Sequence, residues 1–169
     1  MNKNTYKITV MNENGELHDL TEEEVKELCK KNPEIETYLS NPDSIPQELL
    51  ESTLQESWEK VAVKVLNQCW KAKGAFWFYE AVDPVKYGIM DYFDIITNPM
   101  DLGTIKKKLN YNGYENAQEF ANDMKLVWKN CFRYNGEAHE ISQCAREVMN
   151  TFEEASRTQG LNKYYDDWN

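Results

Sequence analysis

The sequence of 169 residues predicts an all-α fold, an antiparallel four-helix bundle with a long loop between its first and second helices. Four segments carry apolar residues at spacings of three and four, the period of an amphipathic helix. Residues 74–100, between the first two segments, are rich in aromatic residues and lack that period. Long loops on a rigid scaffold are usually functional, so we expect the functional site on this loop.

The helices follow one another with short connections after the long loop. The first is expected from about Gln47 to Lys71, the second after Asp101 as N-cap, and the third from about Asn116 to Tyr134. A fourth helix begins near Ile141. The apolar positions that define the four helices are Leu50, Leu54, Trp58, Val61, Val65 and Cys69, then Leu102, Ile105 and Leu109, then Phe120, Met124, Val127, Cys131 and Tyr134, and finally Ile141, Ala145, Val148 and Phe152.

Three regions are expected: an acidic extension at residues 1–45 that packs on or flanks the bundle, the bundle itself at 46–157, and a tail at 158–169. In the extension, alternation at 6–10 and turn residues at 12–15 predict a short hairpin with 16–20. Thr21 and Glu24 have the spacing of a capping box, which begins a helix to about Lys30. A second short helical piece is expected at 34–39.

The chain carries a formal net charge of −10 and a sequence pI near 4.8. Nucleic acid and anionic membranes need clustered Lys and Arg, so neither is expected as a direct partner. A cationic partner fits this charge, although acidity also serves solubility alone. The absence of a long apolar run and of a signal-peptide pattern predicts an intracellular soluble protein, or a piece of one.

The cysteines and histidines predict neither a metal site nor a disulfide. The four cysteines form no CxxC pair, and the two histidines are isolated from each other. We therefore expect free, mostly buried thiols in a reducing compartment, and no cofactor. The residues concerned are Cys29, Cys69, Cys131, Cys144, His18 and His139.

The end of the third helix, Tyr134-Asn135-Gly136, has two interpretations. Asn and Gly both tolerate the left-handed conformation that ends helices, so Asn135 could serve as a cap. In the second interpretation its carboxamide faces a pocket and binds a small polar group of a ligand. The tripeptide alone favours the cap.

Several segments, in register from about residue 47 to 155, resemble the sequence pattern of one known family. Residues 91–109, which begin Asp-Tyr-Phe-Asp-Ile-Ile-Thr-Asn-Pro-Met-Asp-Leu-Gly, resemble the family signature between the long loop and the second helix. Residues 130–135, Asn-Cys-Phe-Arg-Tyr-Asn, match the end of its third helix, and Ala81-Val82-Asp83 matches two positions of its Pro-Val-Asp motif. Together these segments resemble the bromodomain family. The resemblance implies a left-handed bundle that binds acetylated lysine, chiefly on histone tails, without catalysis.

The family assigns roles to individual positions of this sequence. It implies that Asn135 donates a side-chain N–H to the acetyl carbonyl oxygen and that Tyr92 holds a water bridging to the same oxygen. Ile141 takes the gatekeeper position beside the entrance. The remaining pocket lining is implied for Phe78, Val82, Tyr87, Ile89, Cys131 and Tyr134. The resemblance also implies a nuclear protein of chromatin and transcription regulation, acting as a monomeric domain of a larger protein or complex.

The long loop departs from the family pattern and leaves alternatives open. Phe76-Trp77-Phe78 replaces the family's Trp-Pro-Phe, and Ala81 and Met90 replace prolines. We therefore expect a more mobile loop, and a differently shaped aromatic surface where Phe76 replaces the family's tryptophan. One alternative is an interaction module of the same fold with an altered or inactive acetyl-lysine pocket. Another is a thiol hydrolase that uses Cys131 and His139, although Cys131 falls on an apolar helix face.

Overall fold

The structure, a computed structural model of the chain, describes residues 7–11 and 15–166. It divides into two compact units, Met1–Glu56 and Ser57–Asn169. Each unit has an apolar core of its own, with no buried residue shared between the two clusters. The residues expected at the functional site lie in the second unit.

The first unit contains the expected hairpin. Strands β1 (Thr9–Met11) and β2 (Leu17–Asp19) pair antiparallel, with Val10 opposite His18. Tyr6 and the predicted turn residues 12–14 lie outside the described residues. The hairpin prediction is therefore confirmed for the paired residues.

Helix α1 (Glu22–Lys31) begins with the predicted capping box. The Glu24 backbone N–H donates to Thr21 Oγ1 at 3.3 Å, and the Thr21 N–H donates to Glu24 Oε2 at 2.8 Å. Two 3-10 helices, η1 (Pro33–Tyr38) and η2 (Pro42–Ser44), and helix α2 (Gln47–Leu54) complete the unit. Its core consists of Ile8, Val10, Leu28, Ile35 and Leu50.

The predicted continuous helix from Gln47 to Lys71 is wrong. Helix α2 ends at Leu54, and α3 (Trp58–Trp70) begins after a break in which Gln55 and Ser57 have extended ψ angles of 126° and 145°. Helix α2 contributes Leu50 to the core of the first unit. Apolar periodicity alone could not reveal the break, because the last apolar residue of α2 and the first of α3 are four positions apart.

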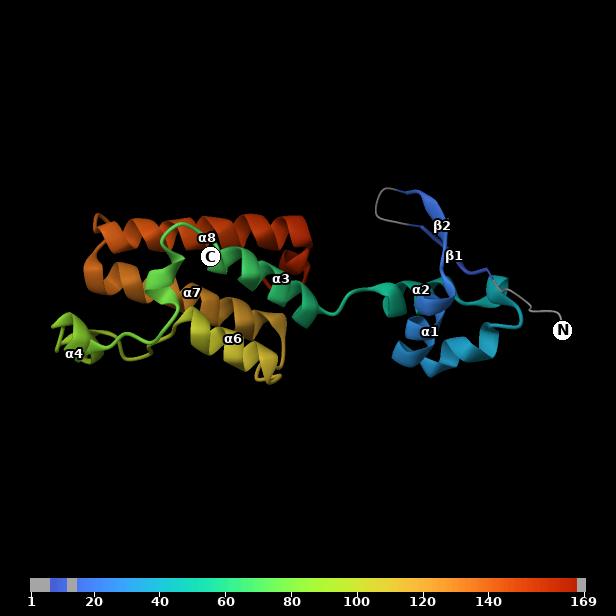
Figure 1. Cartoon of the computed structure of the whole chain (residues 1–169), viewed down its shortest axis with the longest axis horizontal. Coiled ribbons are helices and arrows are strands. Elements are labelled where there is room, and N and C mark those ends of the chain that lie inside the picture. Colours follow the sequence, from blue (N-terminus) through green and yellow to red (C-terminus); the bar gives the residue numbers. More distant parts are fainter. Residues whose placement is uncertain (1–6, 12–14, 167–169) are drawn as a thin grey trace. The chain divides into compact units, whose positions relative to one another are not determined.

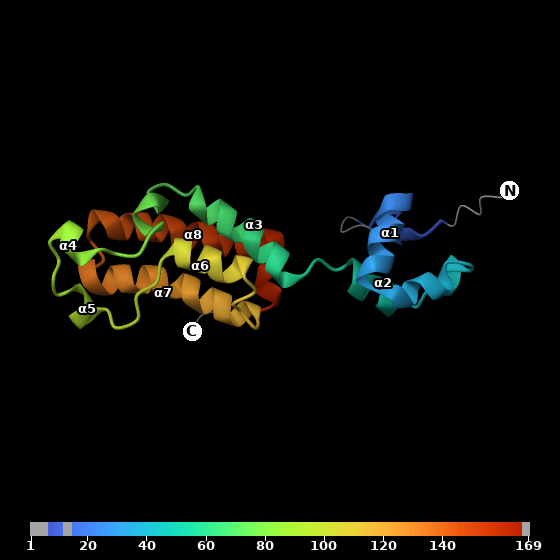
Figure 2. The same ribbon diagram turned by 60° about the horizontal axis from the view of Figure 1, so that its bottom comes forward.

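The second unit is a bundle of α3, α6 (Leu102–Asn110), α7 (Ala117–Asn135) and α8 (Glu140–Gln159). Helix α8 packs against both α3 and α7, and α6 packs against α3 and α7. Figures 1 and 2 show these four helices side by side in both views. The predicted all-α four-helix bundle is confirmed, with Asp101 and Asn116 as the N-caps of α6 and α7.

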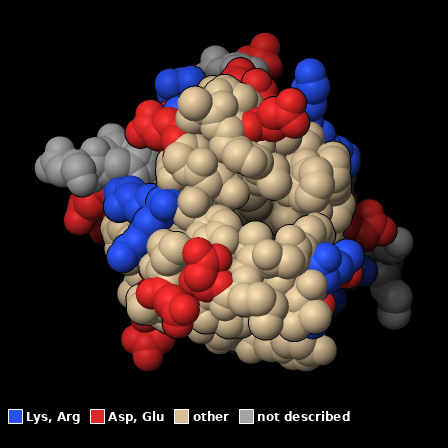
Figure 3. Space-filling model, turned by 90° about the vertical axis from the view of Figure 1, so that its left-hand side faces the viewer, with Lys and Arg blue, Asp and Glu red and all other residues tan. Residues whose placement is uncertain are grey.

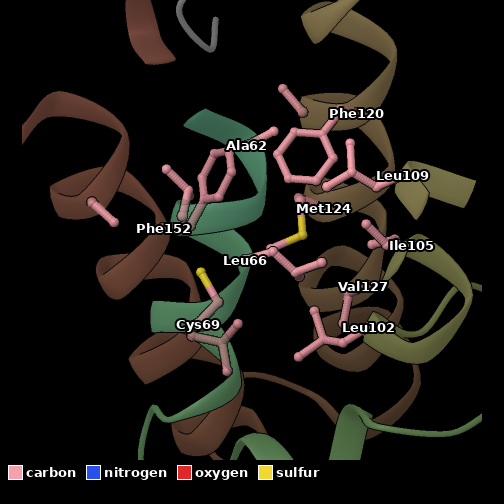
Figure 4. Packing of buried hydrophobic residues seen from close by; sticks show 14 of the residues in the cluster. Ala62, Leu66, Cys69, Leu102, Ile105, Leu109, Phe120, Met124, Val127 and Phe152 are labelled. Carbon is pink, nitrogen blue, oxygen red and sulfur yellow. The ribbon is translucent and has the colours of Figure 1, made fainter. Parts of the chain in front are cut away.

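The four helices share one apolar core. Figure 4 shows side chains from all four pointing toward one another between the ribbons. Phe120 and Phe152, both fully buried, lie 6.2 Å apart between ring centroids. The buried members labelled in Figure 4 are Ala62, Leu66, Cys69, Leu102, Ile105, Leu109, Phe120, Met124, Val127 and Phe152.

The residues expected to form a C-terminal tail pack on this core. Helix α8 continues to Gln159, and a 3-10 turn, η4 (Leu161–Lys163), follows it. Leu161 is fully buried, and the Tyr165 ring stacks on Phe152 at 6.1 Å between centroids. The described part of this segment therefore belongs to the bundle.

The long loop between α3 and α6 contains three short helices, which apolar periodicity did not predict. They are η3 (Ala75–Phe78), α4 (Pro84–Tyr87) and α5 (Tyr92–Ile95). Asp83 begins α4 by accepting backbone N–H groups of Val85 and Lys86 at 3.0 and 3.1 Å. In Figures 1 and 2 the loop covers the end of the bundle where α7 ends and α8 begins.

Truncation of Phe152 is expected to destabilise the bundle strongly. Phe152→Ala should lower the free energy of unfolding by about 3–5 kcal/mol, because it leaves a cavity among fully buried rings. All five tryptophans lie after residue 56, so tryptophan fluorescence during urea unfolding reports on this unit. Val63→Ala on α3, 38% exposed, should change the value by less than about 0.5 kcal/mol. Equal effects of the two substitutions would contradict the assignment of the core.

The stability of the bundle is expected to fall at alkaline pH. Burial raises the pKa of the Cys69 thiol from its ordinary value of 9.0 to about 12. Between these values the unfolded chain loses the proton while the folded chain keeps it. This contribution is therefore complete below pH 9 and is lost as the pH rises toward 12, at up to about 1.4 kcal/mol per pH unit. Urea titrations between pH 8 and 10.5 should show a shallower decline for Cys69→Ala than for the wild type, and parallel declines would refute this origin.

Candidate functional site

A cavity of about 820 Å³ opens between the long loop, the end of α7 and the start of α8. Figure 3, which looks onto this end of the bundle, shows a hollow bordered chiefly by uncharged residues. The structure brings all nine residues expected at the site into the wall of this one cavity. They are Phe78, Val82, Tyr87, Ile89, Tyr92, Cys131, Tyr134, Asn135 and Ile141.

Asn135 is the last residue of α7, and Gly136 provides the helix cap. Gly136 has a φ of 78°, which favours glycine, and its N–H donates to the Phe132 carbonyl at 2.9 Å. Asn135 therefore keeps helical backbone geometry, and its side chain is not needed as a cap. Of the two interpretations of this tripeptide, the structure assigns the cap to Gly136 and turns Asn135 toward the cavity.

The Asn135 carboxamide is half-buried and only partly engaged. Its Nδ2 donates to the Cys131 carbonyl at 3.2 Å and lies 3.6 Å from the Cys131 Sγ. Sulfur is a weak acceptor, so a carbonyl oxygen brought into the cavity would compete for this N–H. The hydrogen bond to the carbonyl of the preceding turn fixes the direction of the amide group.

The segment after Asn135 is held by α8. The hydroxyl of Ser142, which is fully buried, donates to the Gly136 carbonyl at 2.6 Å. Arg146 donates to the Glu137 carbonyl at 2.8 Å and to its carboxylate at 3.2 Å. These contacts, which we call the α8 clasp, fix the connection between α7 and α8. Ser142, Arg146 and Glu137 were not expected from the sequence to matter.

Tyr92 supplies a polar group deep in the cavity. Its side chain is 6% exposed, and its ring meets the Tyr134 ring edge-on at 5.0 Å between centroids. The phenol is neutral and can both donate and accept a hydrogen bond, and burial raises its pKa. Its hydroxyl has no hydrogen-bond partner within residues 7–11 and 15–166. A ligand or a water molecule can therefore bind to it.

Two hydrogen bonds hold the long loop to α7. The Tyr134 hydroxyl donates to Asp91 Oδ1 at 2.7 Å, and this hydrogen bond raises the Tyr134 pKa. The Asn130 carboxamide, 8% exposed, donates to the Asn98 carbonyl at 2.7 Å. A carboxamide in the buried stretch of a helix needs such a partner, and this is the signal from which its role could have been inferred.

The other end of the loop is anchored on α3 and α6. The Tyr79 hydroxyl donates to the Trp70 carbonyl at 2.5 Å, and the two rings stack at 4.1 Å. At Gly103, a Cβ atom would lie 2.2 Å from the Tyr79 carbonyl oxygen, so the backbones approach too closely for any side chain. The start of the loop is thereby pressed onto the first turn of α6.

Asp101 lies in the cavity wall, but its carboxylate is occupied. Its Oδ2 accepts the Thr104 backbone N–H at 2.8 Å, and its Oδ1 accepts the Thr104 hydroxyl at 2.6 Å. It therefore caps α6 and offers little to a ligand. The cavity walls near Asn135 are otherwise mainly apolar.

The cavity also includes residues that were not expected from the sequence. Trp77, 41% exposed, belongs to the wall, as does Phe76, 60% exposed. Their exposure follows from η3, a single turn that buries Ala75 and Phe78 and leaves the residues between them outside. The other additional members are Tyr79, Glu80, Ala81, Asp83, Lys86, Met100, Asp101, Val127 and His139.

The cavity does not provide an activated thiol. Burial raises the pKa of Cys131, whereas a nucleophilic cysteine needs a lowered pKa. His139 begins α8, and its Nδ1 accepts the Ile141 backbone N–H at 3.1 Å. Within the described ranges, no group of three His, Cys, Asp or Glu residues could hold a metal ion. No helix among those same residues is long and apolar enough to span a membrane.

Removal of the Asn130 carboxamide is expected to weaken the attachment of the loop. Asn130→Ala removes the hydrogen bond that the buried Asn130 carboxamide donates to the Asn98 carbonyl, which should cost about 0.5–1.5 kcal/mol in the free energy of unfolding. Urea unfolding followed by tryptophan fluorescence measures this change. Asn122→Ala on the exposed face of the same helix is the matched control and should have little effect. A null result for Asn130 would show that the hydrogen bond does not hold the loop.

Comparison with known proteins agrees with this geometry. A family model described as bromodomain matches residues 62–147. An ankyrin repeat, bromo and BTB domain-containing protein of Dictyostelium discoideum is 41% identical over 90 residues, 53% of this chain and 11% of that protein. The SWR1 complex bromodomain subunit of Schizosaccharomyces pombe is 35% identical over 135 residues, 80% of this chain and 22% of that protein.

This chain thus spans less than a quarter of the length of either relative. The family model covers half of this chain, including most of α3, all of α6 and α7, and the start of α8. The matched segment also contains the whole long loop and every residue expected at the site. The chain belongs to the bromodomain family.

Proposed function

We propose that this chain binds acetylated lysine in the cavity described above and does so without catalysis. The observation that carries the proposal is the position of Asn135 and Tyr92, which present neutral hydrogen-bonding groups to one mainly apolar cavity. Neutral polar groups suit a neutral amide, which is what acetylation makes of the lysine ammonium group. The buried, protonated thiol of Cys131 gives no support to hydrolysis.

In the proposed complex, apolar walls cover the lysine stem and the acetyl methyl group. Phe78, Val82 and Ile141 supply such walls, and each buried Å² of apolar surface contributes about 25 cal/mol. The carbonyl oxygen still requires donors, because an unpaired buried carbonyl costs about 1–3 kcal/mol. Asn135 donates one N–H, and a water held by the Tyr92 hydroxyl donates another. Tyr87, Ile89, Cys131 and Tyr134 complete the proposed lining.

The same cavity would reject unmodified lysine. Burial of an ammonium group requires a partner of opposite charge. The buried carboxylate in the wall, Asp101, already accepts two hydrogen bonds from Thr104. Glu80 and Asp83 are exposed and lie on the loop. Discrimination would therefore come as much from exclusion of the charge as from recognition of the amide.

We further propose histone tails as the source of the acetylated lysine, with the chain acting in chromatin and transcription regulation in the nucleus. A formal net charge of −10 favours the approach of a lysine-rich tail. One relative is named as a subunit of the SWR1 complex, which supports a place for this chain, as a monomeric domain, in a larger assembly. The same charge argues against direct binding to nucleic acid or to an anionic membrane.

The substitutions in the long loop favour a second candidate function. Phe76-Trp77-Phe78 stands where the family pattern has Trp-Pro-Phe, and Phe76 is 60% exposed beside the cavity. A protein–protein interaction module with an inactive acetyl-lysine pocket would share this fold and this exposed surface. Binding that does not depend on acetylation or on Asn135 would favour this candidate.

Substitution of Asn135 tests the primary proposal. Titration with acetylated and unmodified histone-tail peptides should show binding of the acetylated forms alone. Asn135→Ala should weaken that binding by about 1–3 kcal/mol, because the acetyl carbonyl loses its direct donor. Asn122→Ala, on the exposed face of α7, serves as control and should bind like the wild type. Equal binding of acetylated and unmodified peptides, or an Asn135→Ala variant that binds normally, would refute the proposal.

A further inference from the structure

Three aromatic side chains, Phe76, Trp77 and Tyr87, form what we call the aromatic shelf at the mouth of the cavity. The Phe76 and Trp77 ring centroids lie 5.1 Å apart, and those of Trp77 and Tyr87 lie 6.4 Å apart. The three residues are 60%, 41% and 49% exposed. Contiguous exposed apolar surface of this kind usually marks a binding site.

We propose that the aromatic shelf binds a positively charged side chain, arginine or lysine, that lies close to the acetyl-lysine in the same peptide. This inference rests on the proposed acetyl-lysine function and names the peptide class that the site prefers. It makes Trp77 the specificity-determining residue. The shelf is continuous with the cavity, so one peptide can reach both.

The chemistry of the shelf favours a cation over an apolar side chain. The face of an aromatic ring is electron-rich, and among the aromatic residues tryptophan attracts a cation most strongly. Glu80 lines the same cavity, is exposed, and forms no ion pair within the described residues. An apolar occupant would remove solvent from that carboxylate without compensation.

The charge of the loop points the same way. Residues 74–100 contain one basic residue, Lys86, and four acidic residues, Glu80, Asp83, Asp91 and Asp94. Figure 3 shows both acidic and basic side chains around the hollow, whose rim is chiefly uncharged. A cationic side chain at the mouth would therefore meet a favourable field before it reaches the rings.

The structure already contains an example of this interaction on the shelf. The Lys86 ammonium group lies over the Tyr87 ring, 5.3 Å from its centroid. No Lys or Arg among the described residues lies over Trp77. The tryptophan is thus the member of the shelf whose face a ligand cation can take.

Peptides that contain one acetyl-lysine and one arginine test the inference. The arginine is placed in turn at each of the three positions on either side of the acetyl-lysine, and a matched set carries citrulline instead. Citrulline has the planar shape of arginine without its charge. At one or two positions, the arginine peptide should bind the wild type about two- to fivefold more tightly than its citrulline counterpart.

Variants locate the effect. Trp77→Leu should reduce the ratio of the two affinities, both measured on the variant itself, to about one. Tyr111→Leu, which removes an 84% exposed aromatic ring outside the cavity wall, should keep the wild-type ratio. Near-ultraviolet and far-ultraviolet circular dichroism and the urea midpoint of each variant show whether the fold is intact.

The outcomes separate the two proposals. Equal affinities for arginine and citrulline peptides at every position would overturn the cation site and leave acetyl-lysine binding in place. A preference that persists in Trp77→Leu would also overturn it, because general charge attraction would then be sufficient. If binding depends on neither acetylation nor Asn135, both proposals fail together.

Discussion

A hydrogen bond between a buried carboxamide and a loop carbonyl controls where the long loop of this protein can lie. Asn130 cannot be buried without a partner, and the carbonyl of Asn98, on the far side of the loop, provides one. The loop also begins under constraint, because the Tyr79 carbonyl packs on Gly103 at the start of α6. With both parts fixed to the bundle, the residues between them must arch over the ends of α7 and α8. The cavity is the space beneath this arch.

The chemistry of the cavity follows from where α7 stops. A helix that ended one turn earlier would leave its last carbonyls in the cavity, and a longer helix would fill the space with its own backbone. Gly136 ends the helix in a backbone conformation that is energetically less favourable for other residues. The Asn135 side chain is therefore not needed as the cap. Tyr92 is uncharged at neutral pH, and burial raises its pKa further. The site thus offers neutral hydrogen-bonding groups, and it is suited to neutral polar ligands.

The sequence predicted the bundle more accurately than its boundaries. Spacings of three and four residues identified α6, α7 and α8, because each buries one continuous stripe. The same signal failed at Gln55, where two helices of different units happened to be in phase. At the site, the motifs identified the residues that line the cavity, since these occupy fixed places in the family pattern. The residues that hold the cavity open, such as Ser142, could not be predicted, because a buried hydroxyl acquires its partner only when the chain has folded.

The α8 clasp has a further consequence for the thermodynamics of the cavity. Ser142 and Arg146 restrain the backbone that follows Asn135 before any ligand arrives. The conformational entropy of this segment is consequently lost during folding, and association does not have to order it. Affinity then depends on residues that a ligand never touches, since a looser clasp would transfer the entropic cost from the folding reaction to the binding reaction. Part of the binding free energy at this site is thus determined by Ser142, a residue of α8 that does not line the cavity.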